Sequence, residues 1–92
     1  MIQGFACSDT KRLWLSGKSK PFARIEKVAL RKLDMLNAAI VLDDLRSPPG
    51  NHLETLRGDR KGQHSIRINE QFRICFVWTT TGPAKVEIVD YH

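Results

Sequence analysis

The spacing of apolar residues divides the chain into a helical first half and a second half made of strands. Residues 21–45 repeat apolar side chains at helical spacing, which predicts a long helix with one apolar stripe. Pro21 suits its first turn. The stripe faces a sheet, and the opposite side meets solvent, nucleic acid or an acidic partner. The stripe comprises Phe22, Ile25, Ala29, Leu33, Leu36 and Ile40, and the charged residues largely outside it are Lys27, Arg31, Lys32 and Asp34.

A shorter helix and an opening strand are expected before the long helix. Residues 2–7 suggest a strand, and residues 8–16 suggest a helix with an apolar side at Leu13 and Trp14. Ser8 or Asp9 can serve as its N-cap, and Gly17 can end it.

Alternation with a period of two predicts strands after residue 51. Two prolines and a glycine in residues 46–51 end the helical region. In residues 72–78, Phe72, Ile74, Phe76 and Trp78 alternate with Arg73, Cys75 and Val77, and residues 64–69 alternate similarly. Further strands are expected at residues 52–58 and 84–92, joined by connections at 58–63, 69–71 and 79–83.

This order of elements predicts an α+β fold with two N-terminal helices packed on a small, twisted, mainly antiparallel sheet. The 92 residues form a single domain, 1–92, with no repeat or linker. Because such a domain has a small core, a shallow groove for a large partner is easier to build than a deep pocket.

The charge distribution narrows the choice of partners. The net charge is +5, with Lys and Arg concentrated in residues 1–32 and 57–73. A basic surface favours phosphate-rich partners or an acidic protein. No apolar run reaches the roughly 18 residues of a membrane helix, and no signal peptide is evident, so we expect a cytoplasmic protein without membrane contact. Cys7 and Cys75 are expected to be reduced and at least partly buried.

Arg73 is the first candidate for chemistry, because it lies in mid-strand among apolar residues. A buried charge needs a partner. That partner is either a carboxylate, Asp90 or Glu54, or a phosphate, which suits the rigid fork of a guanidinium.

The C-terminal residues Asp90, Tyr91 and His92 supply an acid, a phenol and an imidazole at the end of the last expected strand. In a regular strand, Asp90 and His92 face one side and Tyr91 the other. His52 and His64 do not form a metal signature with His92, so we expect no metal and no cofactor. The basic loop at residues 58–62 lacks the spacing of a P-loop, which leaves a solvated hairpin loop or a phosphate contact.

The stretch LETLRGDRKGQHSIRINEQFRICFVW, followed by VEIVDYH, resembles HigB-type toxins of the RelE/ParE superfamily. The resemblance extends over the whole chain and is most specific in its second half. It implies a RelE/ParE-like toxin of a type II toxin–antitoxin system that cleaves translated mRNA in the A site of the 70S ribosome. In this metal-independent endoribonuclease reaction, the RNA's own 2′-hydroxyl attacks the adjacent phosphate.

The resemblance also assigns roles to residues. Arg73 would stabilise the phosphate charge, Asp90 and His92 would share proton transfer, and Tyr91 would stack on a base or place the 2′-hydroxyl. Glu54 stands where some members carry a catalytic histidine, so it either acts as the base or only pairs with Arg73; His52 could partly substitute. The residues expected to hold RNA backbones are Arg57, Arg60, Lys61 and Arg67.

The expected partner is a HigA-type helix-turn-helix antitoxin, through which the complex would bind operator DNA. Lys18, Lys20, Arg24 and Arg31 are the expected antitoxin surface. Two alternatives stay open: a toxin of the same fold that acts on DNA gyrase, and a weakly active or inactive toxin that serves mainly as corepressor.

Overall fold

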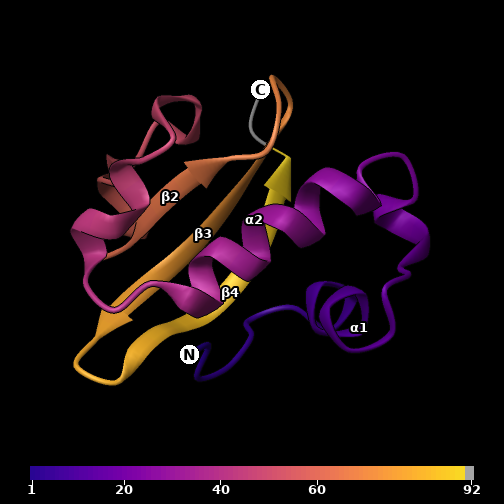
Figure 1. Ribbon diagram of the computed structural model, residues 1–92, viewed down its shortest axis with the longest axis horizontal. Helices are drawn as coiled ribbons and strands as arrows, with labels where there is room; N and C mark the ends of the chain where they lie inside the picture. The colour runs from indigo at the N-terminus through magenta and orange to yellow at the C-terminus, as the bar shows by residue number, and fades with distance from the viewer. Residues whose placement is uncertain (91–92) are drawn as a thin grey trace.

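Two α-helices cover one face of a four-stranded antiparallel sheet in the computed structural model, which describes residues 1–90 (Figure 1). Helix α1 spans Ser8–Ser16 and α2 spans Glu26–Ala38. The strands lie side by side in chain order, and short 3₁₀ turns occur between the elements. The strands are β1 Glu54–Thr55, β2 His64–Arg67, β3 Phe72–Thr79 and β4 Gly82–Asp90. The predicted α+β fold is therefore confirmed.

Helix α1 ends where the sequence predicts and begins slightly differently. Gly17 has φ 81° and donates its backbone N–H to the carbonyl of Leu13 at 2.8 Å, the left-handed cap that glycine makes at little cost. The N-cap, however, is the extended residue Cys7, so the prediction of Ser8 or Asp9 is wrong.

Helix α2 is much shorter than the predicted helix over residues 21–45. The carboxylate of Asp44 accepts hydrogen bonds from the backbone N–H groups of Ile40 (2.9 Å) and Val41 (3.2 Å). These two bonds lower the pKa of Asp44 and hold the backbone outside the helix. As a result Ile40 is 85% exposed and is not part of the apolar stripe.

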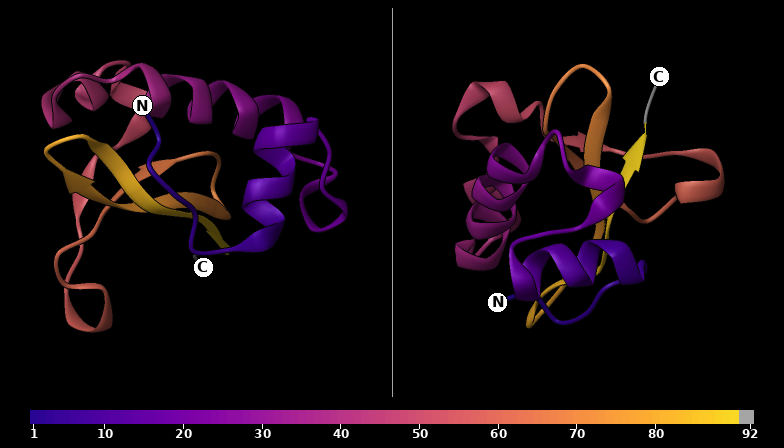
Figure 2. Two further views of the ribbon diagram at one scale, coloured as in Figure 1. Left: turned by 90° about the horizontal axis from the view of Figure 1, so that it is seen from below. Right: turned by 90° about the vertical axis from the view of Figure 1, so that its right-hand side faces the viewer.

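The core lies between the two helices and the sheet, as Figure 2 shows from two directions. Three isoleucines form a continuous row across the sheet: Ile66 pairs with Ile74, which pairs with Ile88. The helices contribute fully buried apolar side chains to the other side of this layer, one from the apolar side of α1 and three from the predicted stripe. These are Leu13, Ala29, Leu33 and Leu36.

A bulge twists the hairpin of β3 and β4. Cys75 pairs with Glu87 and Val77 pairs with Ala84, so two residues of β4, Lys85 and Val86, lie opposite Phe76 alone. Lys85 adopts φ 51°, which accommodates the additional residue. Val86 remains fully buried, so the inward alternation continues beyond the bulge.

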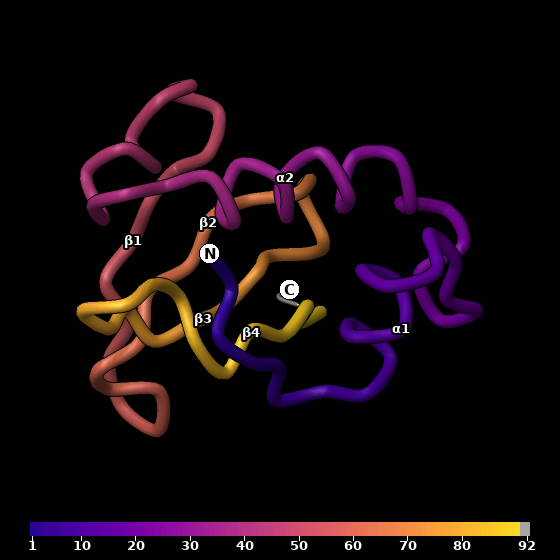
Figure 3. Tube along the Cα trace, turned by 60° about the horizontal axis from the view of Figure 1, so that its bottom comes forward, coloured from indigo at the N-terminus to yellow at the C-terminus, as the bar shows by residue number. Residues whose placement is uncertain are grey.

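The expected opening strand at residues 2–7 is reduced to one bridge. Phe5 pairs in parallel with Val86, and neighbouring backbone bonds hold the segment along β4 (Figure 3). The predicted strand at residues 52–58 likewise contains only Glu54 and Thr55, since Pro49–Asn51 forms a 3₁₀ turn and Gly58–Arg60 forms another.

The position of Ile74 in the core gives a test of the fold. Ile74→Ala should lower the free energy of unfolding by roughly 2–5 kcal/mol, because it removes a fully buried side chain. Ile40→Ala makes the same change at a residue that is exposed, and it should alter the free energy of unfolding by no more than about 0.5 kcal/mol. Urea denaturation followed by circular dichroism measures both. Equal losses would contradict the observed end of α2.

Candidate functional site

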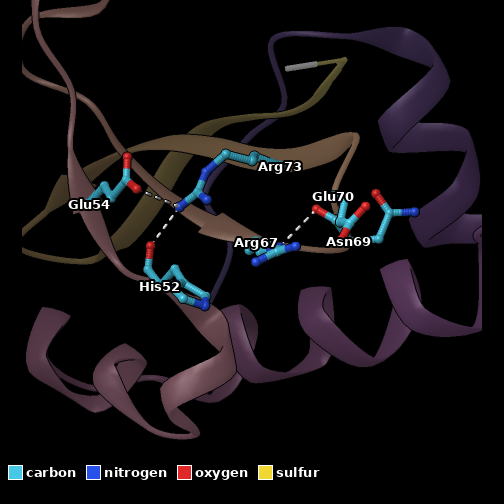
Figure 4. A pocket seen from close by; sticks show the side chains of 6 residues that line it. All are labelled: His52, Glu54, Arg67, Asn69, Glu70 and Arg73. Carbon is cyan, nitrogen blue, oxygen red and sulfur yellow. Dashed lines mark hydrogen bonds and ion pairs between the residues drawn. The ribbon is translucent and has the colours of Figure 1, made fainter. Parts of the chain in front are cut away.

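A shallow, open hollow lies on the face of the sheet directed away from the core (Figure 4). Its volume is about 240 Å³, below the roughly 300–1,000 Å³ usual for small-molecule pockets. Such a hollow suits one group that is presented by a larger partner. The lining residues are His52, Glu54, Arg67, Asn69, Glu70 and Arg73.

Arg73 is the central group of this hollow, and it is only 8% exposed. Strand alternation places it opposite Ile74, on the outer face of β3. Its Nε donates to Ser65 Oγ at 2.8 Å, and its Nη2 donates to the carbonyl oxygen of His52 at 2.5 Å. The guanidinium is therefore held on two sides by neutral acceptors.

Glu54 is one of the two carboxylates that the sequence offered as partners of Arg73. Its Oε1 lies 3.9 Å from Arg73 Nη2, a long ion pair, and the Glu54 side chain is 55% exposed. A carboxylate at this distance can accept a proton from a bound group without being locked to the arginine. The structure thus brings Glu54 and Arg73 together in one hollow.

Ser65 is a residue of the site that sequence reasoning missed. It is fully buried, and its Oγ and its carbonyl oxygen (3.5 Å) both face Arg73. The alternation of residues in β2 could have predicted this position, because Ser65 and Arg67 share the face opposite to Ile66.

Asp90, the other carboxylate, lies on the opposite face of the sheet. Its pairing partner is Phe72, whose ring contacts Phe22 on the core side. Asp90 Oδ2 accepts a hydrogen bond from Gln71 Nε2 at 3.0 Å. The strand register therefore directs the Asp90 side chain to the face opposite that of Arg73. Tyr91 and His92 lie outside the described residues.

The two other histidines lie in different environments. His52 lines the hollow and contributes its carbonyl to Arg73, whereas His64 lies on the core side with its ring 6.1 Å from that of Phe76. Within residues 1–90, no three His, Cys, Asp or Glu side chains are grouped so that they could hold a metal ion.

The basic residues predicted to bind RNA are distributed unevenly around the hollow. Arg67 lines it, with Nε donating to the carbonyl oxygen of Asn69 at 3.1 Å. Arg60 Nη1 instead forms an ion pair with Glu87 Oε1 at 2.8 Å, which ties the loop after β1 to β4. Arg57 and Lys61 are exposed on that loop, which projects from the outer face of the sheet (Figure 2).

Comparison with protein families gives a match over almost the whole chain. Residues 5–92 match the family described as "RelE-like toxin of type II toxin-antitoxin system HigB". Within the described residues, 1–90, no helix is both long enough and apolar enough to cross a membrane.

Two related proteins are similar over parts of their length. Toxin HigB-1 of Vibrio cholerae is 52% identical over 54 residues, which cover 59% of this chain and 57% of the relative. A Haemophilus influenzae protein described as uncharacterized is 47% identical over 58 residues, which cover 63% of this chain and 57% of the relative. The match thus spans little more than half the length of each relative.

A solved structure shares the fold. The "YoeB-YefM complex from Staphylococcus aureus" contains a chain that aligns with a TM-score of 0.63 at 20% identity. The alignment covers 100% of this chain and 95% of that one, and it supports the same arrangement of helices and sheet.

The burial of Cys75 on the outer face of β3 leads to a prediction about cysteine reactivity. Cys75 is fully buried, and this burial raises the pKa of its thiol above the usual value, so little thiolate forms near neutral pH. Cys7 is half-buried. We expect iodoacetamide at pH 8 to alkylate Cys7 well before Cys75, as followed by mass spectrometry, with the two rates converging in urea. Equal rates in the native protein would contradict the burial of Cys75.

Proposed function

This chain belongs to the HigB-like family of RelE-like toxins from type II toxin–antitoxin systems, and we propose that it is a ribosome-dependent endonuclease of messenger RNA. The substrate is mRNA in the A site of the ribosome, and cleavage inhibits translation. The observation that supports this function best is the buried guanidinium of Arg73 at the base of an open hollow beside the carboxylate of Glu54.

The hollow supplies two of the groups that RNA cleavage needs. The 2′-hydroxyl oxygen forms a bond to the adjacent phosphorus while the bond to the 5′-oxygen breaks, leaving a cyclic phosphate and a 5′-hydroxyl. Negative charge accumulates on the phosphate in the transition state, and Arg73, fixed in advance by Ser65 and His52, stabilises it there. Glu54 accepts the 2′-hydroxyl proton.

The remaining roles in the proposed reaction fall to Asp90, Tyr91 and His92. Asp90 and His92 share the remaining proton transfer to the 5′-oxygen and the orientation of the substrate, and Tyr91 stacks on a base or places the 2′-hydroxyl. Since Asp90 lies beside Gln71 on the core side of β4, the RNA has to pass around the turn between β2 and β3 to meet both groups.

The exposed Lys and Arg side chains near the hollow are the proposed contacts to the RNA backbone. Arg67 in its lining, and Arg57 and Lys61 on the loop after β1, hold phosphates of the messenger and of ribosomal RNA. Arg60 contributes chiefly by fixing that loop through Glu87. A toxin of this kind works in the cytoplasm, where ribosomes translate.

A HigA-type helix-turn-helix antitoxin is the proposed protein partner, and the complex binds operator DNA through the antitoxin. The proposed contact surface comprises Lys18, Lys20, Arg24 and Arg31, since these residues are basic and all four are exposed. Lys20 and Arg24 also line a second hollow, next to Phe22 and Phe72, which offers an apolar contact beside the charges.

The role of Arg73 can be tested by mapping 5′ ends of cellular mRNA after brief induction. Wild type should create new ends within translated regions. Arg73→Ala should reduce them roughly 100- to 1,000-fold, because the transition-state charge loses its donor. Lys11→Ala, at an exposed position of α1, is the control and should match wild type. Growth arrest with intact messages would overturn the proposal and point to a target such as gyrase; no arrest and no new ends would point to a corepressor.

Glu54 can be tested separately on purified programmed ribosomes. Glu54→Gln keeps the shape and the acceptor oxygen but cannot take up a proton, so the cleavage rate should fall roughly 100- to 10,000-fold. Asp34→Asn, which removes an exposed carboxylate from α2, should leave the rate within about twofold of wild type. A rate near wild type for Glu54→Gln would show that Glu54 only pairs with Arg73.

A further inference from the structure

Lys32 is buried on α2, although the sequence pattern places it outside the apolar stripe. The residue is only 7% exposed. Its Nζ donates to Asn51 Oδ1 at 2.5 Å, and among residues 1–90 no carboxylate forms an ion pair with it. Burial, and to a smaller extent the charge of Arg31, lowers the pKa of Lys32. Burying a charged amine costs free energy unless it is hydrogen-bonded. The hydrogen bond to Asn51 offsets part of this cost for Lys32.

Asn51 joins α2 to the segment that leads into β1. It is fully buried, and its Nδ2 donates to the carbonyl oxygens of Leu45 at 3.2 Å and Ser47 at 3.3 Å. With Oδ1 occupied by Lys32, the side-chain amide of Asn51 is bonded at both ends. The backbone at residue 51 is therefore fixed relative to α2.

The next residue, His52, has an unusual backbone conformation. Its φ and ψ are 45° and 54°, the left-handed region, which residues other than glycine adopt only where the surroundings impose it. Its carbonyl oxygen is the acceptor for Arg73 Nη2. The direction of this carbonyl depends on how Asn51, one residue earlier, is held.

From these contacts we propose that Lys32 and Asn51 are positioning residues, which aim the guanidinium of Arg73 by holding the His52 carbonyl in place. The consequence for RNA cleavage rests on the function proposed above. The contacts run from α2 through Asn51 and His52 to the hollow on the outer face of the sheet. Neither Lys32 nor Asn51 lines the hollow itself.

The second anchor of Arg73 explains why this support is needed. Ser65 accepts from Nε at 2.8 Å and lies 3.5 Å from Nη2 through its carbonyl oxygen, whereas the His52 carbonyl makes the shorter bond to Nη2, at 2.5 Å. The His52 carbonyl fixes the far end. Because a misplacement of about 1 Å can cost a reaction roughly 100-fold, losing the second anchor should slow cleavage without removing any group that contacts RNA.

The first test needs no activity. In the purified full chain, the ¹⁵N and ¹H resonances of Arg73 Nε–Hε report its environment. Lys32→Met and Asn51→Ala should each shift or broaden this signal, while the exposed control Lys11→Met should not. Thermal unfolding of each variant checks that it is folded, and because the two variants break the same bond from opposite sides, either one can carry the test. An unchanged Arg73 signal in a folded variant would overturn the inference.

The second test separates positioning from a general loss of structure. On programmed ribosomes under single-turnover conditions, Lys32→Met should lower the maximal cleavage rate about 10- to 100-fold and leave the half-saturating toxin concentration unchanged. In an Arg73→Ala background, the same substitution should cause no further loss, because the group that it positions is absent. Lys11→Met serves as the control in both backgrounds.

The outcomes distinguish this inference from the proposed function. A wild-type protein that does not cleave, with the Arg73 signal still displaced in Lys32→Met, would refute the nuclease and leave the positioning of Arg73 supported. Cleavage by wild type together with an unchanged rate for Lys32→Met would overturn the inference. An equal further loss in the Arg73→Ala background would also overturn it, since the effect would then not pass through Arg73.

Discussion

The alternation of side chains along β3 is the constraint on which the rest of this structure depends. Ile74 and Phe76 face the helices and are fully buried, so the register of the whole strand is fixed by the core. A slip of one residue would exchange the two faces and move Arg73 into the apolar layer. The same burial that stabilises the fold therefore determines which face of the sheet the Arg73 guanidinium lies on.

Burial of Arg73 is compatible with stability because its acceptors are built from neighbouring backbone and one hydroxyl. Ser65 Oγ and the His52 carbonyl satisfy donors without neutralising their charge, and Glu54 stands at 3.9 Å. The lining of the hollow combines two arginines, Arg67 and Arg73, with two carboxylates, Glu54 and Glu70.

The elements that local patterns determine could be predicted from the sequence, and those that depend on distant contacts could not. The alternation of residues 72–78 and the stop at Gly17 are local signals, and both correspond to observed structure. The end of α2 was missed because the Asp44 carboxylate captures backbone groups at Ile40 and Val41, a competition that apolar spacing does not reveal. The burial of Lys32 was missed because its acceptor, Asn51, lies across a turn. For the site, the sequence offered Glu54 as one of two possible carboxylate partners of Arg73, and the structure places Glu54 beside it, but the His52 carbonyl has no side-chain signature.

The hollow is lined by one continuous segment of the chain, whereas the core combines residues that are distant in sequence. All the residues that line the hollow come from residues 52–73, in adjacent antiparallel strands and their connections. The core instead needs α1 and α2, which are distant in sequence from the sheet. A short continuous segment thus lines the hollow, while the N-terminal half supplies the layer against which that segment packs. Where the buried residues of α2 keep their apolar contacts, substitutions on its exposed face should leave the hollow unchanged. The bond between Lys32 and Asn51 is the exception, because it links α2 directly to the residue before His52, whose carbonyl holds Arg73.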